Sequence, residues 1–289
     1  MLQLGGIVFL FICVFVPFLM SGGSLSVVIE AAPHELATIL GAAIAATLIA
    51  SSMFNIKQIL RSLGKAISGP MWKPKDYTDL LCLLFLLTKT AKSKGMIALE
   101  AHIEKPTESA IFKRYPKICK DHFALDFICD TLRMMTMSLE DPHQVETHME
   151  KQLEKHHHEA LVSANALQTM ADGLPALGIV AAVLGVIKTM GAISEPPEVL
   201  GGMIGSALVG TFLGVFLAYG LVGPLGNRLR AVIDEDAQFY RVIRDIMVAH
   251  LHGNAAQVSI EIGRGSVPSE YQPSFQTLEE SLNAIPPEG

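Results

Sequence analysis

The side chains whose types and spacing come nearest to a reactive site lie between residues 154 and 159. Three consecutive histidines, His156, His157 and His158, are flanked there by Glu154 and Glu159. Imidazole and carboxylate groups are ligands that zinc prefers, so a metal-binding membrane enzyme is one hypothesis. Consecutive side chains on a helix point in different directions, however, and do not converge on one ion. We interpret the run as a solvated helix face, and we expect no metal, no cofactor and no enzymatic activity.

The four cysteines form no motif of their own. They are Cys13, Cys82, Cys119 and Cys129, and none belongs to a C-x-x-C pair. Separated thiols of this kind are typical of a reducing compartment and predict neither a disulfide framework nor a zinc site.

Polar chemistry is sparse within the long apolar stretches. Thr211 is the main polar residue deep in one of them, and its hydroxyl can bond either a backbone carbonyl or a partner's carboxylate. Pro175 and Pro224 stand at the ends of two stretches, where a proline either punctuates a helix or makes a hinge. The charged residues Glu35 and Lys188 fall near the edges of these stretches, where the free-energy cost of placing a charge in the membrane is low. Intramembrane proton carriers are normally carboxylates or histidines, so proton conduction by this chain would require a carboxylate from a partner.

The composition predicts a membrane protein with several spans. Of the 289 residues, 50% are hydrophobic and only 17% are charged, and the net charge of −6 argues against a general nucleic-acid binder. A span needs about 20 apolar residues. Four segments qualify: Leu4–Met20, Glu35–Phe54, Leu174–Thr189 and Val199–Leu225. The first lacks the basic start and the cleavage site of a signal peptide, so we expect it to be a retained membrane helix.

The positions of lysine and arginine predict the orientation of these spans. Sixteen of the 22 basic residues lie in 55–172 and five in 225–289, whereas the short connectors have none. Because positive loops stay in the cytoplasm, both termini should be cytoplasmic and the connectors periplasmic. The predicted segments are a first transmembrane hairpin, a large cytoplasmic domain, a second hairpin and a cytoplasmic tail: 1–54, 55–172, 173–225 and 226–289.

The predicted fold class is all-α, with four transmembrane helices and a large helical cytoplasmic domain. Helical periodicity outside the membrane is clearest in three stretches: Leu80–Lys94, Phe123–Met137 and Glu146–Leu167. Gly69-Pro70 and Asp141-Pro142 predict breaks. Val258–Ile262 is the one candidate strand, and the Pro-, Ser- and Glu-rich chain after Gly265 is expected to fray or to be disordered.

Small residues recur every four positions along the fourth span, at Ser206, Gly210, Gly214 and Ala218. Similar rows mark the second and third spans. Such rows allow two helix backbones to approach closely. Two interpretations remain open: tight packing within one chain, or a surface for a partner helix or a second copy.

Several runs resemble the MotA branch of the MotA/TolQ/ExbB proton-channel superfamily. The run from Gly173 to Gly185 resembles the third helix of flagellar stator proteins, and the run from Val209 to Gly220, followed by Pro224, resembles the fourth. The run from Met20 to Leu25 resembles the first periplasmic turn, and the run from Lys94 to Glu100 resembles the segment that faces the rotor. The resemblance covers nearly the whole chain in the right order.

This resemblance implies a partner and an ion path. Proteins of the MotA type form a pentamer in the inner membrane around two copies of a MotB-type subunit, which supplies the ion-binding aspartate. Pro175 and Pro224 match two prolines that couple ion passage to movement, and Thr211 matches a polar residue near that aspartate. Ala182 stands where sodium-driven relatives have threonine, whose hydroxyl suits a hard cation. Ala182 therefore favours protons.

The resemblance also implies a contact with the rotor protein FliG. Glu100 matches the acidic member of a pair of rotor-contacting charges. Lys92 lies at the position where the family commonly has arginine, and it keeps the charge without the planar guanidinium. Lys94, two residues on, is a second candidate for the basic role.

The implied function is that of a flagellar motor stator subunit, which turns ion flow into torque for motility and chemotaxis. The alternative is an energiser of outer-membrane processes of the ExbB or TolQ type, which typically has three spans. A small-molecule transporter is disfavoured, because transporters place polar groups or broken helices at mid-membrane, often in repeated halves.

Overall fold

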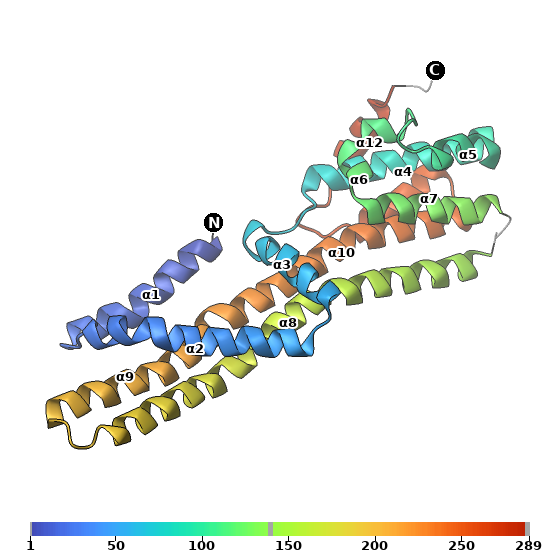
Figure 1. Cartoon of the computed structure of the whole chain (residues 1–289). Coiled ribbons are helices and arrows are strands. Elements are labelled where there is room, and N and C mark those ends of the chain that lie inside the picture. The colour runs from blue at the N-terminus through green and yellow to red at the C-terminus, as the bar shows by residue number, and fades with distance from the viewer. Residues whose placement is uncertain (1, 138–140, 287–289) are drawn as a thin grey trace. The chain divides into compact units, whose positions relative to one another are not determined.

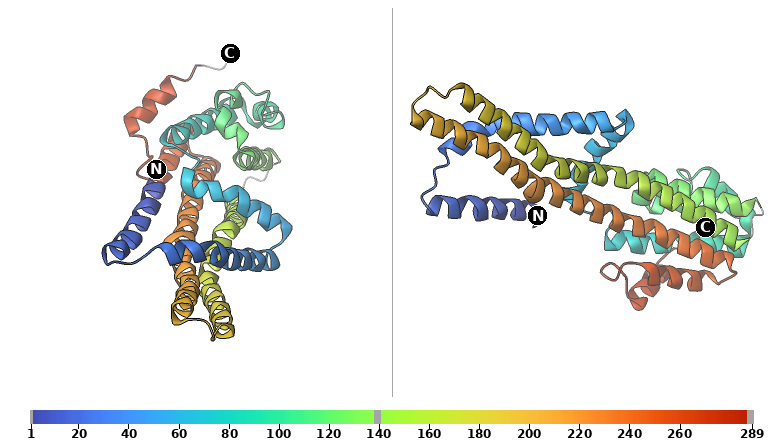
Figure 2. Two further views of the ribbon diagram at one scale, coloured as in Figure 1. Left: turned by 60° about the vertical axis from the view of Figure 1, so that its left-hand side comes forward. Right: turned by 90° about the horizontal axis from the view of Figure 1, so that it is seen from below.

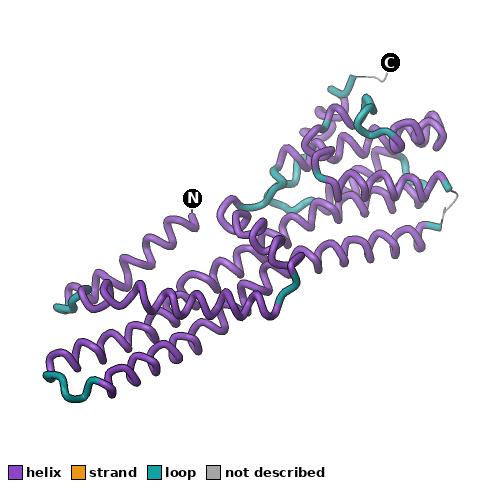
Figure 3. The backbone as a smooth tube through the Cα atoms, in the orientation of Figure 1, coloured by secondary structure: helices purple, strands orange, loops and turns teal. Residues whose placement is uncertain are grey.

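The computed structural model describes residues 2–137 and 141–286, and all regular structure in these ranges is helical (Figure 3). The elements are α1 (Leu2–Met20), α2 (Ser26–Ala50), α3 (Met53–Ser68), α4 (Pro74–Lys94), α5 (Met96–Glu104), the 3-10 helix η1 (Phe112–Arg114), α6 (Pro116–Lys120), α7 (His122–Thr136), α8 (Pro142–Gly191), α9 (Pro197–Val215), the π-helix η2 (Phe216–Val222), α10 (Gly223–Leu251), α11 (Ala256–Ser266) and α12 (Phe275–Asn283). The prediction of an all-α fold is confirmed.

Among the described residues, four helical segments are long and apolar enough to cross a membrane. They are α1, α2, the apolar part of α8, and the continuous run of α9, η2 and α10. The four predicted spans are therefore confirmed as elements. The predicted breaks are confirmed too, since α3 ends just before Gly69 and α8 begins at Pro142.

The chain folds into two units. Unit 1 is built from Met1–Gly69 and Ala160–Val232, and unit 2 from Pro70–Glu159 and Ile233–Gly289. Helices α8 and α10 are each divided between the two units.

Unit 1 is organised around the hairpin of α8 and α9. Helix α2 packs against α9 (Figure 1), and it buries Ala31, Ile39 and Ala43. Helix α1 buries no side chain in this chain, which is the pattern of a helix that faces lipid. It touches the rest of the unit through aromatic rings, and the Phe11 and Phe216 centroids lie 5.3 Å apart.

Unit 2 has a core of large apolar side chains. Trp72 stacks on Phe239 with ring centroids 3.7 Å apart, and both side chains are buried. Helix α4 runs through this core and contacts α5, α11 and α12. The start of α4 is held by Asp76, which accepts a hydrogen bond from the Lys73 backbone and pairs with Lys117.

Three expectations from the sequence were wrong in detail. Helix α2 begins at Ser26 rather than at Glu35, because Pro33 lies within the helix instead of opening it. The candidate strand Val258–Ile262 belongs to α11, whose buried residues Ser259, Ile260 and Gly263 share one helical face.

The chain after Gly265 is also more ordered than expected. Residues 275–283 form α12, with the Ser274 hydroxyl accepting a hydrogen bond from the Thr277 backbone as an N-cap. Leu278 from α12 is buried in the core of unit 2. One apolar anchor and a good cap therefore outweigh a composition typical of disorder, and residues 287–289 lie outside the described part of the chain.

Candidate functional site

The α8–α9 hairpin is held by backbone-to-backbone contacts at glycines. A Cβ atom on Gly178 would lie 2.8 Å from the carbonyl oxygen of Gly210, and one on Gly214 would lie 2.7 Å from that of Leu174. Figure 2 shows the two helices side by side from two further directions. These glycines serve packing within one chain. For them, the first of the two open interpretations is therefore the correct one. Gly201, near the start of α9, has no atom within 4 Å of a Cβ position.

Thr211 follows Gly210 at this contact, and its side chain is half-buried. Its hydroxyl makes no hydrogen bond with any described residue. The hydroxyls of Thr47 and Thr189, also in membrane helices, each donate to the carbonyl four residues earlier at 2.9 Å. The Thr211 hydroxyl is therefore not used by its own backbone, and it remains available to another group.

Ala182 lies across the hairpin from Gly210, the residue before Thr211. Its backbone nitrogen is 3.2 Å from the Cβ position of Gly210. The structure thus places Ala182 at the level of Gly210 in the α8–α9 contact, one residue before Thr211.

Neither predicted coupling proline ends its helix. Helix α8 continues through Pro175, which has no N–H to donate to the carbonyl of Ala171. Pro224 is the second residue of α10, and the π-helix η2 ends two residues before it, at Val222; the Gly223 N–H that follows η2 donates to the Ala218 carbonyl. Interpretation of these prolines as simple helix ends is therefore wrong, and Pro224 marks a local change of helix type.

The π-helix was missed by the sequence analysis. It spans seven residues, and π-helical turns are rare and often lie at functional sites. A proline clashes with the carbonyl four residues earlier in an α-helix, and wider turns before Pro224 relieve that clash. The combination of Gly220, Gly223 and Pro224 was the available signal, although it does not distinguish a π-helix from a kink.

The predicted rotor-contact residues lie in unit 2, around the junction of α4 and α5. Gly95 joins the two helices with a φ of +83°, a conformation that favours glycine. Lys94 and Glu100 are exposed on either side of it. Ile97 lies between them and is 85% exposed, and this large apolar side chain was not singled out from the sequence.

Lys92 has a structural role as well as an exposed position. Its ammonium group donates to the carbonyl oxygens of Gly253 and Asn254 at 3.2 and 3.3 Å. These carbonyls follow the C-terminus of α10, where a cation is favourable. The Lys92 ammonium group therefore also stabilises the C-terminal end of α10.

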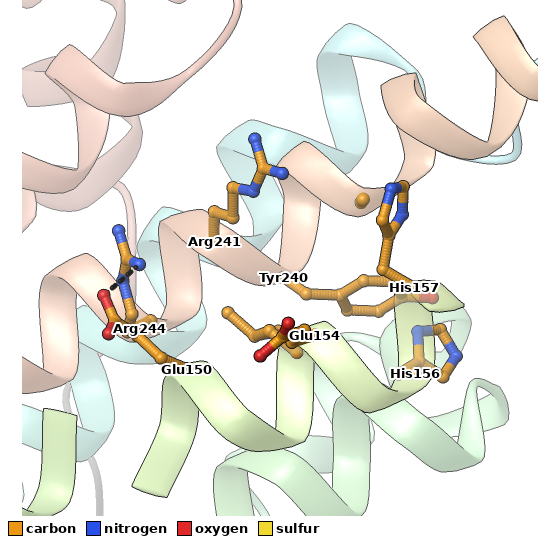
Figure 4. A pocket seen from close by; sticks show the side chains of 9 residues that line it. Glu150, Glu154, His156, His157, Tyr240, Arg241 and Arg244 are labelled. Atoms are coloured by element: carbon orange, nitrogen blue, oxygen red, sulfur yellow. Dashed lines mark hydrogen bonds and ion pairs between the residues drawn. The ribbon is translucent and has the colours of Figure 1, made fainter. Parts of the chain in front are cut away.

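The histidine run lies beside a cleft of about 270 Å³ between α8 and α10 (Figure 4). The His156 ring stacks on Phe123 at 3.7 Å, whereas His157 Nε2 lies 3.2 Å from the Asp234 carboxylate. The two rings diverge, as the helical spacing predicted, but both side chains are half-buried, so the interpretation of a solvated face is wrong for them and fits only the exposed His158. Across the cleft, Arg244 pairs with Glu150 at 3.1 Å, so the polar groups there bind one another.

Comparison with known proteins identifies the family of the chain. A model for the N-terminal part of motility protein A matches residues 4–95, and the model of the MotA/TolQ/ExbB proton channel family matches residues 120–241. The chain is 39% identical to Motility protein A of Escherichia coli (strain K12), over 94% of this chain and 92% of that protein. The chain belongs to the motility protein A family.

Further similar proteins extend the comparison. The Chemotaxis protein LafT of Vibrio parahaemolyticus is 33% identical over 96% of each chain. Two solved structures share the fold. The MotAB structure from C. jejuni has a TM-score of 0.72 at 18% identity, and the flagellar MotAB stator complex from Bacillus subtilis has 0.71 at 22%, each covering 93% of this chain and 96% of theirs.

The glycine contact predicts a sharp positional effect of adding one methyl group. Gly214→Ala should lower the thermal midpoint of the purified chain by roughly 3 to 10 °C, because the new Cβ meets backbone that cannot move aside. Gly201→Ala, the matched control in open space, should leave it unchanged. Heating followed by size-exclusion chromatography measures both, and equal midpoints for the two variants would contradict the packing described here.

Proposed function

We propose that the chain is a stator subunit of the flagellar motor in the bacterial inner membrane. With a MotB-type partner it conducts protons across the membrane and converts the flow into torque on the rotor protein FliG. The observation that carries the proposal is the α8–α9 hairpin of a motility protein A family member, in which Gly210, the residue before Thr211, lies against the backbone of Ala182.

The orientation is proposed from charge. The segments 1–54 and 173–225 cross the membrane as hairpins, while 55–172, 226–289 and both termini are cytoplasmic. Helix α3 supports this topology, because it follows α2 after two residues and carries exposed Lys57, Arg61 and Lys65 beside exposed Leu60 and Ile67. An amphipathic basic helix of this kind suits the lipid headgroups of the cytoplasmic leaflet.

We assign five copies of the chain to the complex, arranged around two MotB-type subunits. A single chain leaves apolar side chains of α8 exposed, as expected for a surface that meets other membrane helices: Ile179, Val180, Val183, Leu184 and Ile187. The partner's transmembrane helix would meet the α8–α9 hairpin and bring its aspartate near Thr211.

Protonation of that aspartate would remove a charge from a low-dielectric site and change which packing is preferred. Each proton supplies about 2.3 kcal/mol per 100 mV. The hairpin would bend at Pro175, at Pro224 and at the π-helix η2 when the packing changes. The rotor contact through Lys92, Lys94 and Glu100 needs little energy, since exposed ion pairs contribute about 0–1 kcal/mol each.

A second candidate is an energiser of the ExbB or TolQ type, because the family model that matches residues 120–241 includes those proteins. The match of residues 4–95 to the N-terminal part of motility protein A favours the flagellar role. The relatives named Motility protein A and LafT favour it too.

Deletion of the gene tests the proposed function. Cells should keep normal flagella seen by electron microscopy but fail to rotate them, and the wild-type gene should restore swimming. A mutant that swims normally while its outer membrane becomes leaky would instead support the energiser.

Pro175→Ala should restore the missing backbone N–H and stiffen α8. We expect rotation of tethered cells to fall severalfold, while the MotB-type partner still co-purifies. Pro197→Ala, at the first position of α9, is the control and should rotate normally. Loss of the partner in the Pro175 variant alone would argue for a role in assembly instead.

Glu100→Lys should reduce torque without reducing ion flow, because Glu100 is exposed on α5 and lies outside the membrane helices. One surface contact is worth up to about 1 kcal/mol, so a drop of about fivefold or less in torque at high load is expected. Glu108→Lys makes the same charge change in a nearby exposed loop and should have little effect. Equal losses in the two variants would show a general charge effect and no specific contact.

A further inference from the structure

Glu35 lies on the packed face of α2. The three buried residues of this helix are Ala31, Ile39 and Ala43, which follow a spacing of four with one position missing. Glu35 fills that position, so its side chain leaves the same face of the helix toward α9. A carboxylate on the packed face of an apolar membrane helix has a high free-energy cost, and such a residue usually has a functional role.

The Glu35 carboxylate reaches the central glycine of the α8–α9 contact. A Cβ atom on Gly210 would lie 2.6 Å from Glu35 Oε2, 3.1 Å from the Ala181 methyl and 3.2 Å from the Ala182 nitrogen. Only a glycine leaves room for the carboxylate there. Gly210 is thirteen residues into α9, or roughly 20 Å along its axis, and is followed directly by Thr211.

The position of Glu35 corrects an expectation from the sequence. The residue was placed at the edge of the membrane because the second span was expected to begin there. Helix α2 begins nine residues earlier, at Ser26, and carries Glu35 past the edge to the level of Gly210. The chain therefore supplies a carboxylate of its own beside the predicted ion-path residues.

An open cavity of about 430 Å³ connects Glu35 with the end of unit 1 that carries the two short connectors. It is lined by α2, by α8 and by α9, and its volume would hold roughly ten waters. The other titratable side chains in its walls are Glu30 and His34 from α2 and Lys188 from α8, and α9 contributes none among the lining residues. Within the described chain, the Glu35 carboxylate has no hydrogen bond or ion pair, so its oxygens remain open to water.

We propose that Glu35 is a proton-relay carboxylate between this cavity and the ion path of the α8–α9 hairpin. This inference rests on the proposed function of the chain as a proton-conducting stator subunit. A hydronium ion in the cavity gives its proton to Glu35 Oε2, which forms a carboxyl O–H and leaves water behind. That O–H then breaks toward water beside Ala182 and Thr211, the carboxylate is regenerated, and the proton moves on to the next acceptor.

The relay predicts a specific loss in Glu35→Gln, which keeps the shape of the side chain but cannot exchange a proton in this way. Cells carrying this variant with its MotB-type partner should rotate at least about tenfold more slowly at an external pH of about 7. Acidifying the medium to about pH 5.5 should restore part of the speed, because more hydronium in the cavity offsets the lost relay. Glu35→Asp, which keeps the acid, should retain much of the rotation.

The controls separate this proposal from the proposed function. Glu198→Gln removes a carboxylate from the first turn of α9, outside the cavity lining, and should rotate normally. If the wild-type chain itself fails to drive rotation, the proposed function fails. If the wild type rotates and Glu35→Gln matches it, or is slow at every external pH, the relay is overturned.

Assembly is followed by co-purification of the partner. If Glu35→Gln does not assemble, Glu35→Ala takes its place. If both fail to assemble while Glu35→Asp assembles, the carboxylate is a packing element, and this result also overturns the relay.

Discussion

The structure of unit 1 depends on the close approach of two helix backbones at Gly178, Gly210 and Gly214. Contacts of this kind leave no room for side chains, and they derive their stability from dispersion between many backbone atoms. They also fix the level at which neighbouring groups meet. Gly210, the backbone of Ala182 and the carboxylate of Glu35 lie together because the glycines hold α8 and α9 in one register.

Much of this organisation follows from the sequence alone. Four apolar stretches, the absence of lysine and arginine from two short connectors, and rows of small residues predict the membrane helices and their contacts. The breaks at Gly69-Pro70 and Asp141-Pro142 were equally readable, because backbone chemistry acts locally. The candidate residues of the ion path came from resemblance and remain predictions, and the structure places Gly210, the neighbour of Thr211, against the backbone of Ala182.

What the sequence did not reveal depended on context beyond a local window. A proline at the eighth position of a long helix looks like a helix start, so Pro33 concealed the first turns of α2 and with them the depth of Glu35. The alternating pattern of Val258–Ile262 suited a strand equally well, whereas packing against α4 within unit 2 selects the helix α11. The chain after Gly265 was expected to be disordered because of its composition. A single buried side chain, Leu278, hardly changes the composition but contributes substantially to the stability of the fold.

The π-helix η2 has a consequence for how the chain tolerates insertions and deletions. In a π-helix each N–H donates to the carbonyl five residues earlier, whereas in an α-helix it donates to the carbonyl four residues earlier. The segment therefore contains more residues per turn than a plain α-helix would. Each residue of an α-helix turns the following side chains by about 100°. Loss of a single residue within Phe216–Val222 would convert this stretch toward a plain α-helix and rotate the faces on one side of it relative to the other. Within unit 1, this short segment therefore sets the angular phase between the membrane helix α9 and the first turns of α10, up to Val232.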